Sequence, residues 1–108
     1  MDSESRTVSQ LTRTITLKSI PDKYTLERAY PNPFNPSTTL NFALPIEANV
    51  TLSIYDIQGR LVASLMDQKI EAGYHSVIWN ADAYGSGLYF AKMLSGDYAK
   101  TQKLLLIK

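Results

Sequence analysis

The sequence predicts an all-β domain, an immunoglobulin-like antiparallel β-sandwich of about seven strands. Apolar and polar residues alternate with a period of two in several segments, which is typical of half-buried strands. Turn residues recur about every 8–12 residues, the spacing of antiparallel sandwiches and barrels. No segment shows sustained helical periodicity between caps. The chain has 108 residues, enough for one domain with its own core.

The first part of the chain is expected to lead into the sandwich. Residues 1–25 are interpreted as a linker or N-terminal extension, with an extra strand over 11–18, where threonines favour extended backbone. Pro21 and Asp22 predict a turn, and residues 26–108 are expected to form the sandwich. Three prolines between Tyr30 and Thr38 fix φ near about −65° and keep this segment extended or turned. It is therefore not a central strand.

Two clearly alternating segments follow. Their inward-facing residues are expected to be Leu40, Phe42 and Leu44 in the first strand, and Val50, Leu52 and Ile54 in the second. Residues 56–60 predict a hairpin loop in which Gly59 adopts the left-handed conformation. A partner strand over 61–65 completes the hairpin.

The second half of the chain continues the pattern. A turn at 71–73 precedes a strand in which His75, Val77 and Trp79 share the inner face, with Trp79 as a central core residue. Residues 85–87 break the chain before a strand over 88–94, and a turn at 95–97 leads to the last strand. Tyr89, two residues after Gly87, predicts a tyrosine corner.

Composition excludes several classes of function. Eleven Lys and Arg against ten Asp and Glu give a net charge of +1, without the cationic excess that general nucleic-acid or anionic-membrane binders need. The chain has no cysteine, which excludes disulfides, thiolate metal sites and cysteine nucleophiles. No apolar run is long enough for a membrane-spanning helix. The polar N-terminus lacks the apolar core of a signal peptide, so the chain is expected to be either cytosolic or a piece of a longer protein.

The sequence offers no convincing catalytic or cofactor site. His75 is the single histidine and is expected to be packed or hydrogen-bonded at an edge. The aspartates lie mainly in predicted turns, where they cap their own backbone. We therefore expect no enzyme, no cofactor and no metal, although a calcium site from separate turns is not excluded. Tyr55, Tyr74 and Tyr98 are expected to face outward, and a carbohydrate-binding or adhesive sandwich is the alternative function.

The last segment has two interpretations. It is an apolar stretch flanked by lysines: Lys103, Leu104, Leu105, Leu106, Ile107 and Lys108. It could simply be the last strand, with lysines that discourage aggregation at the edge. Alternatively, it is a handle for a partner that pairs by strand addition or captures the terminal carboxylate. The residues alone do not decide between these.

Several spaced motifs resemble the C-terminal sorting domains of the type IX (Por) secretion system. The opening box corresponds to residues 30–39, the hairpin box to 50–62, two further boxes to 73–81 and 86–90, and the closing box to 103–108. The resemblance covers about residues 25–108 and follows the family order. The motif residues are Tyr30, Pro31, Asn32, Pro33, Phe34, Asp56, Gly59, Arg60, Gly87 and Tyr89. A similar module caps flagellar hook-assembly proteins, which is a further alternative.

The resemblance implies a secretion signal and not a catalyst. Such a domain directs an attached N-terminal cargo protein from the periplasm through the outer membrane to the cell surface or the medium. Its implied partners are the outer-membrane secretion machinery and a sortase-like signal peptidase, which cuts within residues 1–29 before surface anchoring. No nucleic acid is implied, and a monomer is expected. Residues 103–108 are the hypothetical contact with the translocon, with Lys103 and Lys108 as the main contributors.

Overall fold

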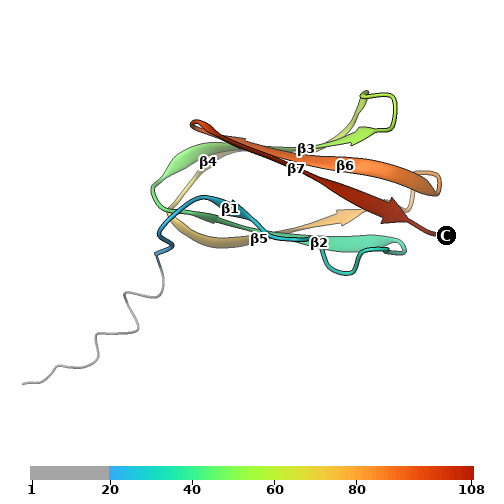
Figure 1. The fold of residues 1–108 in the computed structure, drawn as a ribbon, viewed down its shortest axis with the longest axis horizontal. Coiled ribbons are helices and arrows are strands. Elements are labelled where there is room, and N and C mark those ends of the chain that lie inside the picture. Colours follow the sequence, from blue (N-terminus) through green and yellow to red (C-terminus); the bar gives the residue numbers. More distant parts are fainter. Residues whose placement is uncertain (1–19) are drawn as a thin grey trace, which may run out of the picture.

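The computed structural model describes residues 20–108, in which seven strands form two antiparallel sheets (Figure 1). The strands are β1 (Thr25–Leu26), β2 (Ser37–Leu44), β3 (Ala48–Asp56), β4 (Leu61–Ile70), β5 (Gly73–Asn80), β6 (Gly87–Ser95) and β7 (Tyr98–Leu106). The predicted all-β sandwich is confirmed. The strand expected over 11–18 lies outside the described residues. Residues 20–108 contain no helix with the length and apolar character needed to cross a bilayer.

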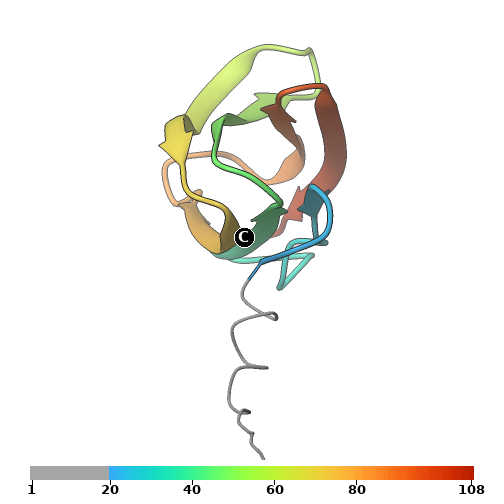
Figure 2. The same ribbon diagram turned by 90° about the vertical axis from the view of Figure 1, so that its left-hand side faces the viewer.

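The two sheets have the connectivity of an immunoglobulin-like sandwich. One sheet has the order β1-β2-β5 and the other has the order β4-β3-β6-β7. The chain passes from the first sheet to the second between β2 and β3, returns at β5 and crosses again before β6. Figure 2 shows the two sheets curving around a common interior. This arrangement places β7 at one edge of the larger sheet.

The core contains the residues that alternation predicts. The predicted inner residues of β2 and β3 are all at most 1% exposed: Leu40, Phe42, Leu44, Val50, Leu52 and Ile54. Trp79 of β5 is 3% exposed, and His75 and Val77 on the same face are half-buried. Burial of each such apolar side chain contributes about 1.5–3 kcal/mol, so these inner faces supply most of the stabilisation.

The turns also follow the sequence. Gly59 has φ +83°, in the left-handed region, and its amide donates to the Asp56 carbonyl at 3.0 Å. Strand β4 extends to Ile70, beyond the predicted end at residue 65, because it pairs with β3 along its whole length. Two register shifts in that pairing, one between Leu52 and Ser53, disturb the alternation of β4. The shifts explain why periodicity alone predicts too short a strand.

Candidate recognition surface around the last strand

Strand β7 divides the predicted recognition residues into two groups. Leu104 and Leu106 are 0% and 1% exposed and belong to the core. Lys103 and Lys108 are exposed, Ile107 is 50% exposed and Leu105 is half-buried. Two of the four apolar residues are thus buried. A partner of the folded domain could contact only the outward-facing group: Lys103, Leu105, Ile107 and Lys108.

The outer edge of β7 is covered by residues 24–34, which we call the arm. At the start of β7, the hydroxyl of Tyr98 accepts a hydrogen bond from the Leu26 amide at 3.0 Å, and its ring stacks on Tyr24 with centroids 5.6 Å apart. Further along, Gln102 accepts from the Ala29 amide at 2.8 Å. Its side-chain amide also donates to the carbonyl of residue 27 at 2.7 Å. The arm is thereby held to a strand more than 70 residues away in the sequence.

The proline-rich part of the arm continues this contact to the end of β7. Asn32 donates through Nδ2 to the Lys103 carbonyl at 2.9 Å and accepts through Oδ1 from the Leu105 amide at 3.0 Å. Phe34 donates its amide to the Leu105 carbonyl at 2.9 Å and accepts from the Ile107 amide at 3.0 Å. The Asn32 side chain therefore takes the place of a peptide group of a neighbouring strand. A partner could add a strand to this part of β7 only by displacing the arm.

Phe34 of the arm and Tyr89, both motif residues, are part of an aromatic cluster centred on Trp79. Phe34 is 2% exposed and lies against Trp79, with ring centroids 5.6 Å apart. Trp79 also meets Tyr89 edge-on at 5.3 Å. The Tyr89 hydroxyl donates to the Gly85 carbonyl at 2.7 Å, which confirms the predicted tyrosine corner. These aromatic motif residues stabilise the end of the sandwich, whereas Tyr30, Pro31 and Pro33 are exposed.

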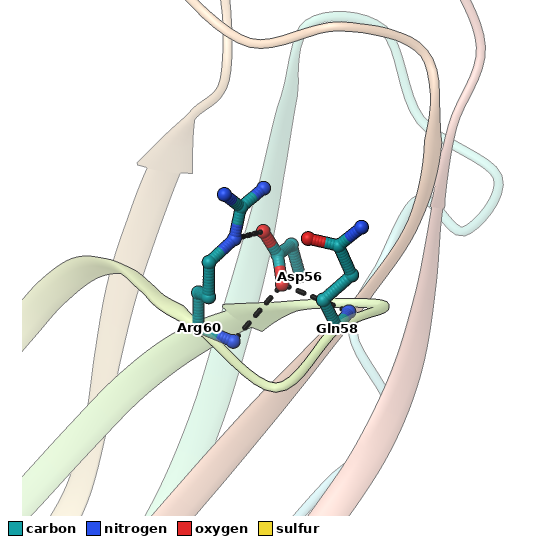
Figure 3. Close-up of polar contacts among 3 residues, drawn as sticks. All are labelled: Asp56, Gln58 and Arg60. Atoms are coloured by element: carbon teal, nitrogen blue, oxygen red, sulfur yellow. Dashed lines mark hydrogen bonds and ion pairs between the residues drawn. The ribbon is translucent and has the colours of Figure 1, made fainter.

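The hairpin between β3 and β4 is a separate, self-contained unit (Figure 3). The carboxylate of Asp56 accepts hydrogen bonds from the amides of Gln58 and Arg60, each at 2.9 Å, and pairs with the Arg60 side chain through Nε at 2.9 Å. The hydrogen bond from the Arg60 amide is the main reason that the pKa of Asp56 lies below its usual range, and desolvation opposes it. The other bonds and the Arg60 charge lower it further. The motif residues Asp56 and Arg60 thus close this loop together with Gly59, whose amide donates to the Asp56 carbonyl.

The sequence missed part of the arrangement around β7. Tyr98 was expected to face outward, and this is wrong: it lies on the same side of β7 as Gln102 and Leu104 and packs against the core. The sequence pattern also does not predict that Gln102 and Arg28 lie at this surface. The signal for Gln102 is its polar side chain at an inward-facing position of the last strand, which requires a hydrogen-bond partner. No such signal marks Arg28.

Within residues 20–108, no three His, Asp or Glu side chains gather closely enough to hold a metal ion. The ring of His75 stacks on Phe42 with centroids 5.3 Å apart, and its Nε2 is hydrogen-bonded to the Glu71 carbonyl at 2.8 Å. This packed, edge-bonded histidine is the one that the sequence predicts.

Comparison with known proteins identifies the family. The family model of secretion system C-terminal sorting domains matches residues 28–108, which include every motif residue named above. A search of curated proteins gave no match. The matched region begins within the arm and ends with the last residue of the chain. The chain therefore belongs to the family of type IX secretion system C-terminal sorting domains.

Proposed function

We propose that the outer-membrane machinery of the type IX system recognises the folded sandwich, and that it binds the exposed residues of β7 and of the C-terminal residues that follow it. The family assignment makes the domain a sorting signal that is attached to a cargo protein and leads to export to the cell exterior or surface. We further propose that Lys103 and Lys108 contribute contacts to the machinery, and that the domain itself has no catalytic activity.

One observation carries this proposal. Leu104 and Leu106 are core residues, whereas Lys103 on the same strand is exposed. A receptor that binds Lys103 on β7 therefore binds the folded domain, because pulling β7 out of the sheet would remove two buried leucines from the core. Their burial stabilises the domain by about 3–6 kcal/mol in total, a large part of the about 5–15 kcal/mol that stabilises a small domain.

Lys108 is held differently from Lys103. Its amide donates to Oγ of Ser86 at 3.0 Å, and its Nζ donates to the Asp82 carbonyl at 2.5 Å. The loop between β5 and β6 therefore fixes the direction of the last residue. Lys103 pairs with Phe90, and Leu106, just before Lys108, pairs with Gly87 at the start of β6. Both lysines therefore lie near the end of the sandwich where β6 begins.

The test is export of a reporter fused to the domain in a bacterium with a type IX system. The double substitution Lys103→Glu and Lys108→Glu should block export while the isolated domain keeps its circular dichroism spectrum and melting temperature. The matched control is Lys69→Glu with Lys100→Glu, which makes the same charge change at two exposed lysines. Normal export of the first variant would refute the assignment of these lysines. Truncation of β7 is a poorer test, since it also removes core residues.

We propose that a sortase-like peptidase cuts the chain before Pro21 and that the released cargo is anchored at the cell surface. Pro21, Leu26 and Ala29 are buried, and the amides of Leu26 and Ala29 are hydrogen-bonded to β7. A peptidase needs an extended, accessible substrate, which favours a cut before this packed stretch, within 1–20 of the expected linker. Mass spectrometry of the domain left after export tests this: a new N-terminus after residue 21 would contradict it.

We also propose that the domain is a monomer, because the arm covers one edge of the larger sheet and thereby removes a template for edge-to-edge association. Sedimentation of the purified domain tests this. A dimer that persists on dilution would contradict it.

A further inference from the structure

Two depressions each include residues of β7 in their lining: Thr101 lines the first, and Gln102 and Lys103 line the second. The first, of about 320 Å³, is on the outer face of the larger sheet, next to the β3–β4 hairpin, and its lining includes Tyr55, Phe90 and Lys92. The second, of about 440 Å³, lies between the arm and β7, and its lining includes Arg28 and Lys103. Lys103 is the cross-strand partner of Phe90, so its side chain is on the same sheet face as the first depression.

The two depressions concentrate positive charge on a chain with a net charge of only +1. Their lining contains three cations, Arg28, Lys92 and Lys103, none of which forms an ion pair with a carboxylate in residues 20–108. The one carboxylate in the lining belongs to Asp56, which already pairs with the neighbouring Arg60. A ligand that neutralises this surface must therefore be anionic.

The surface also has an apolar component. Tyr55 and Phe90 are cross-strand partners whose half-buried rings line the first depression. Ile57 is 70% exposed in the lining and Leu61, the cross-strand partner of Tyr55, is 58% exposed. An apolar side chain of a partner would cover these groups, and Tyr, Phe and Arg are enriched in protein interfaces.

We propose that an acidic segment of a partner protein docks across β7 at Lys103. A carboxylate of the segment lies between Arg28 and Lys103, and an apolar side chain enters the depression over Tyr55 and Phe90. The contact is made by side chains, because the arm already occupies the backbone edge of β7 from the Lys103 carbonyl onward. The inference rests on the proposed function, since it assigns the chemistry of the partner that reads Lys103.

The geometry favours a protein segment over an anionic membrane. One depression is on the outer face of the sheet and the other is at its edge, beyond β7, so they face different directions. A planar bilayer cannot enter both, whereas an extended chain that crosses the strand can.

The first test is an NMR titration of the isotope-labelled 108-residue chain with a synthetic peptide of repeated Glu-Leu-Ser units. We expect amide shifts at Arg28, Phe90, Lys92 and Lys103, and weaker binding at higher salt. Arg28→Glu, Lys92→Glu and Lys103→Glu should each weaken binding about tenfold, because each replaces an attraction by a repulsion. Lys69→Glu, on the same sheet face but at the far end of β4, is the matched control and should bind as the unsubstituted chain does.

Other outcomes would overturn the docking surface. They are equal binding of a Lys-Leu-Ser peptide, absence of any shift at these residues, or binding to phosphatidylglycerol vesicles without binding to the acidic peptide. The last result would assign the surface to a membrane. Circular dichroism of each variant verifies that the charge changes have not unfolded the domain.

Export of the fused reporter separates this inference from the function on which it rests. Arg28→Glu and Lys92→Glu should each reduce export, although neither is in the closing motif. If these two variants export normally while the Lys103→Glu and Lys108→Glu pair blocks export, the docking surface is wrong and the sorting function stands. If the unsubstituted domain does not export the reporter, the proposed function fails, and the peptide titration still decides whether the acidic segment binds.

Discussion

Two regions near the same end of the sandwich both contain family motif residues, yet they are built in different ways. The first, the aromatic cluster, consists of Phe34, Trp79 and Tyr89, which are at most 8% exposed and come from segments far apart in the sequence. The second, the β3–β4 hairpin, is closed by bonds within residues 56–60 and lies at the surface. The register places Asp56 opposite Tyr89, so the two regions are neighbours.

The difference separates residues needed for folding from residues available for recognition. A substitution in the aromatic cluster removes packing that holds the arm and β7 in place, so a loss of export would report unfolding. A substitution in the hairpin changes a loop that the core does not depend on. Motif membership alone therefore does not identify a contact residue, and the exposed motif positions are the useful probes.

The largest expected effect is in the aromatic cluster. Phe34→Ala should destabilise the domain by about 3–5 kcal/mol, because it removes a buried ring and leaves a cavity against Trp79. Urea unfolding followed by tryptophan fluorescence measures this directly. Tyr30→Ala, at a side chain that is 79% exposed in the same motif, is the matched control and should change stability by less than about 0.5 kcal/mol. A loss below about 1 kcal/mol for Phe34→Ala would mean that the cluster does not support the fold.

In the hairpin, the largest expected effect is at Gly59. Gly59→Ala should cost about 1–2 kcal/mol, because φ +83° is unfavourable for a residue with a Cβ, although the space around it is open. Gly85→Ala is the control, since its surroundings are equally open and its φ lies outside the left-handed region. Thermal unfolding of both variants compares them. Equal melting temperatures would contradict a strain at Gly59.

A smaller effect is expected where the arm meets β7. Asn32→Ala removes two exposed hydrogen bonds and should destabilise the domain by about 1 kcal/mol. It should also speed hydrogen exchange at the Leu105 amide, which donates to Asn32. Asn35→Ala, at an exposed asparagine in the same motif, should leave this exchange unchanged. Unchanged protection of Leu105 in the Asn32 variant would show that the arm does not depend on this contact.

The comparison also shows what the sequence could predict. Alternation identifies the inner residues of β2 and β3, because one face of each strand is buried, and Gly59 identifies the hairpin through its backbone freedom. Both signals are local. The cover over β7 depends on pairs such as Leu26 with Tyr98 and Ala29 with Gln102, separated by more than 70 residues. No local pattern specifies such pairs, which arise only when the two sheets close on each other.

The recognition surface is only partly predictable from the sequence, because some of its features are local and others depend on residues far apart in the chain. The lysines that flank the last strand are visible in the sequence, whereas only the structure shows that Leu104 and Leu106 are the buried residues between them. Alternation does not show that Lys103 lies beside Phe90 of β6 or near Arg28 of the arm, because strand order and register set these neighbours. For Tyr98, the missing information was the arm, which provides a partner for the ring and hydroxyl.

The smallest expected effect is a pH dependence confined to the hairpin. The pKa of Asp56 in the folded protein lies below its usual range. The hydrogen bonds of its carboxylate therefore stabilise the hairpin fully at a pH above the pKa of an aspartate in the unfolded chain, about 3.9. This contribution is lost as the pH falls through the lower folded-state value. Asp56→Asn should therefore be less stable than the unsubstituted protein at pH 7, and the difference should shrink as the pH falls below about 4. Melting temperatures at both pH values measure this, with Asp67→Asn as the control for the loss of one charge. A stability difference that grows as the pH falls would show that the Asp56 carboxylate does not stabilise the hairpin. In that case, Gly59 would be the main determinant of the hairpin conformation.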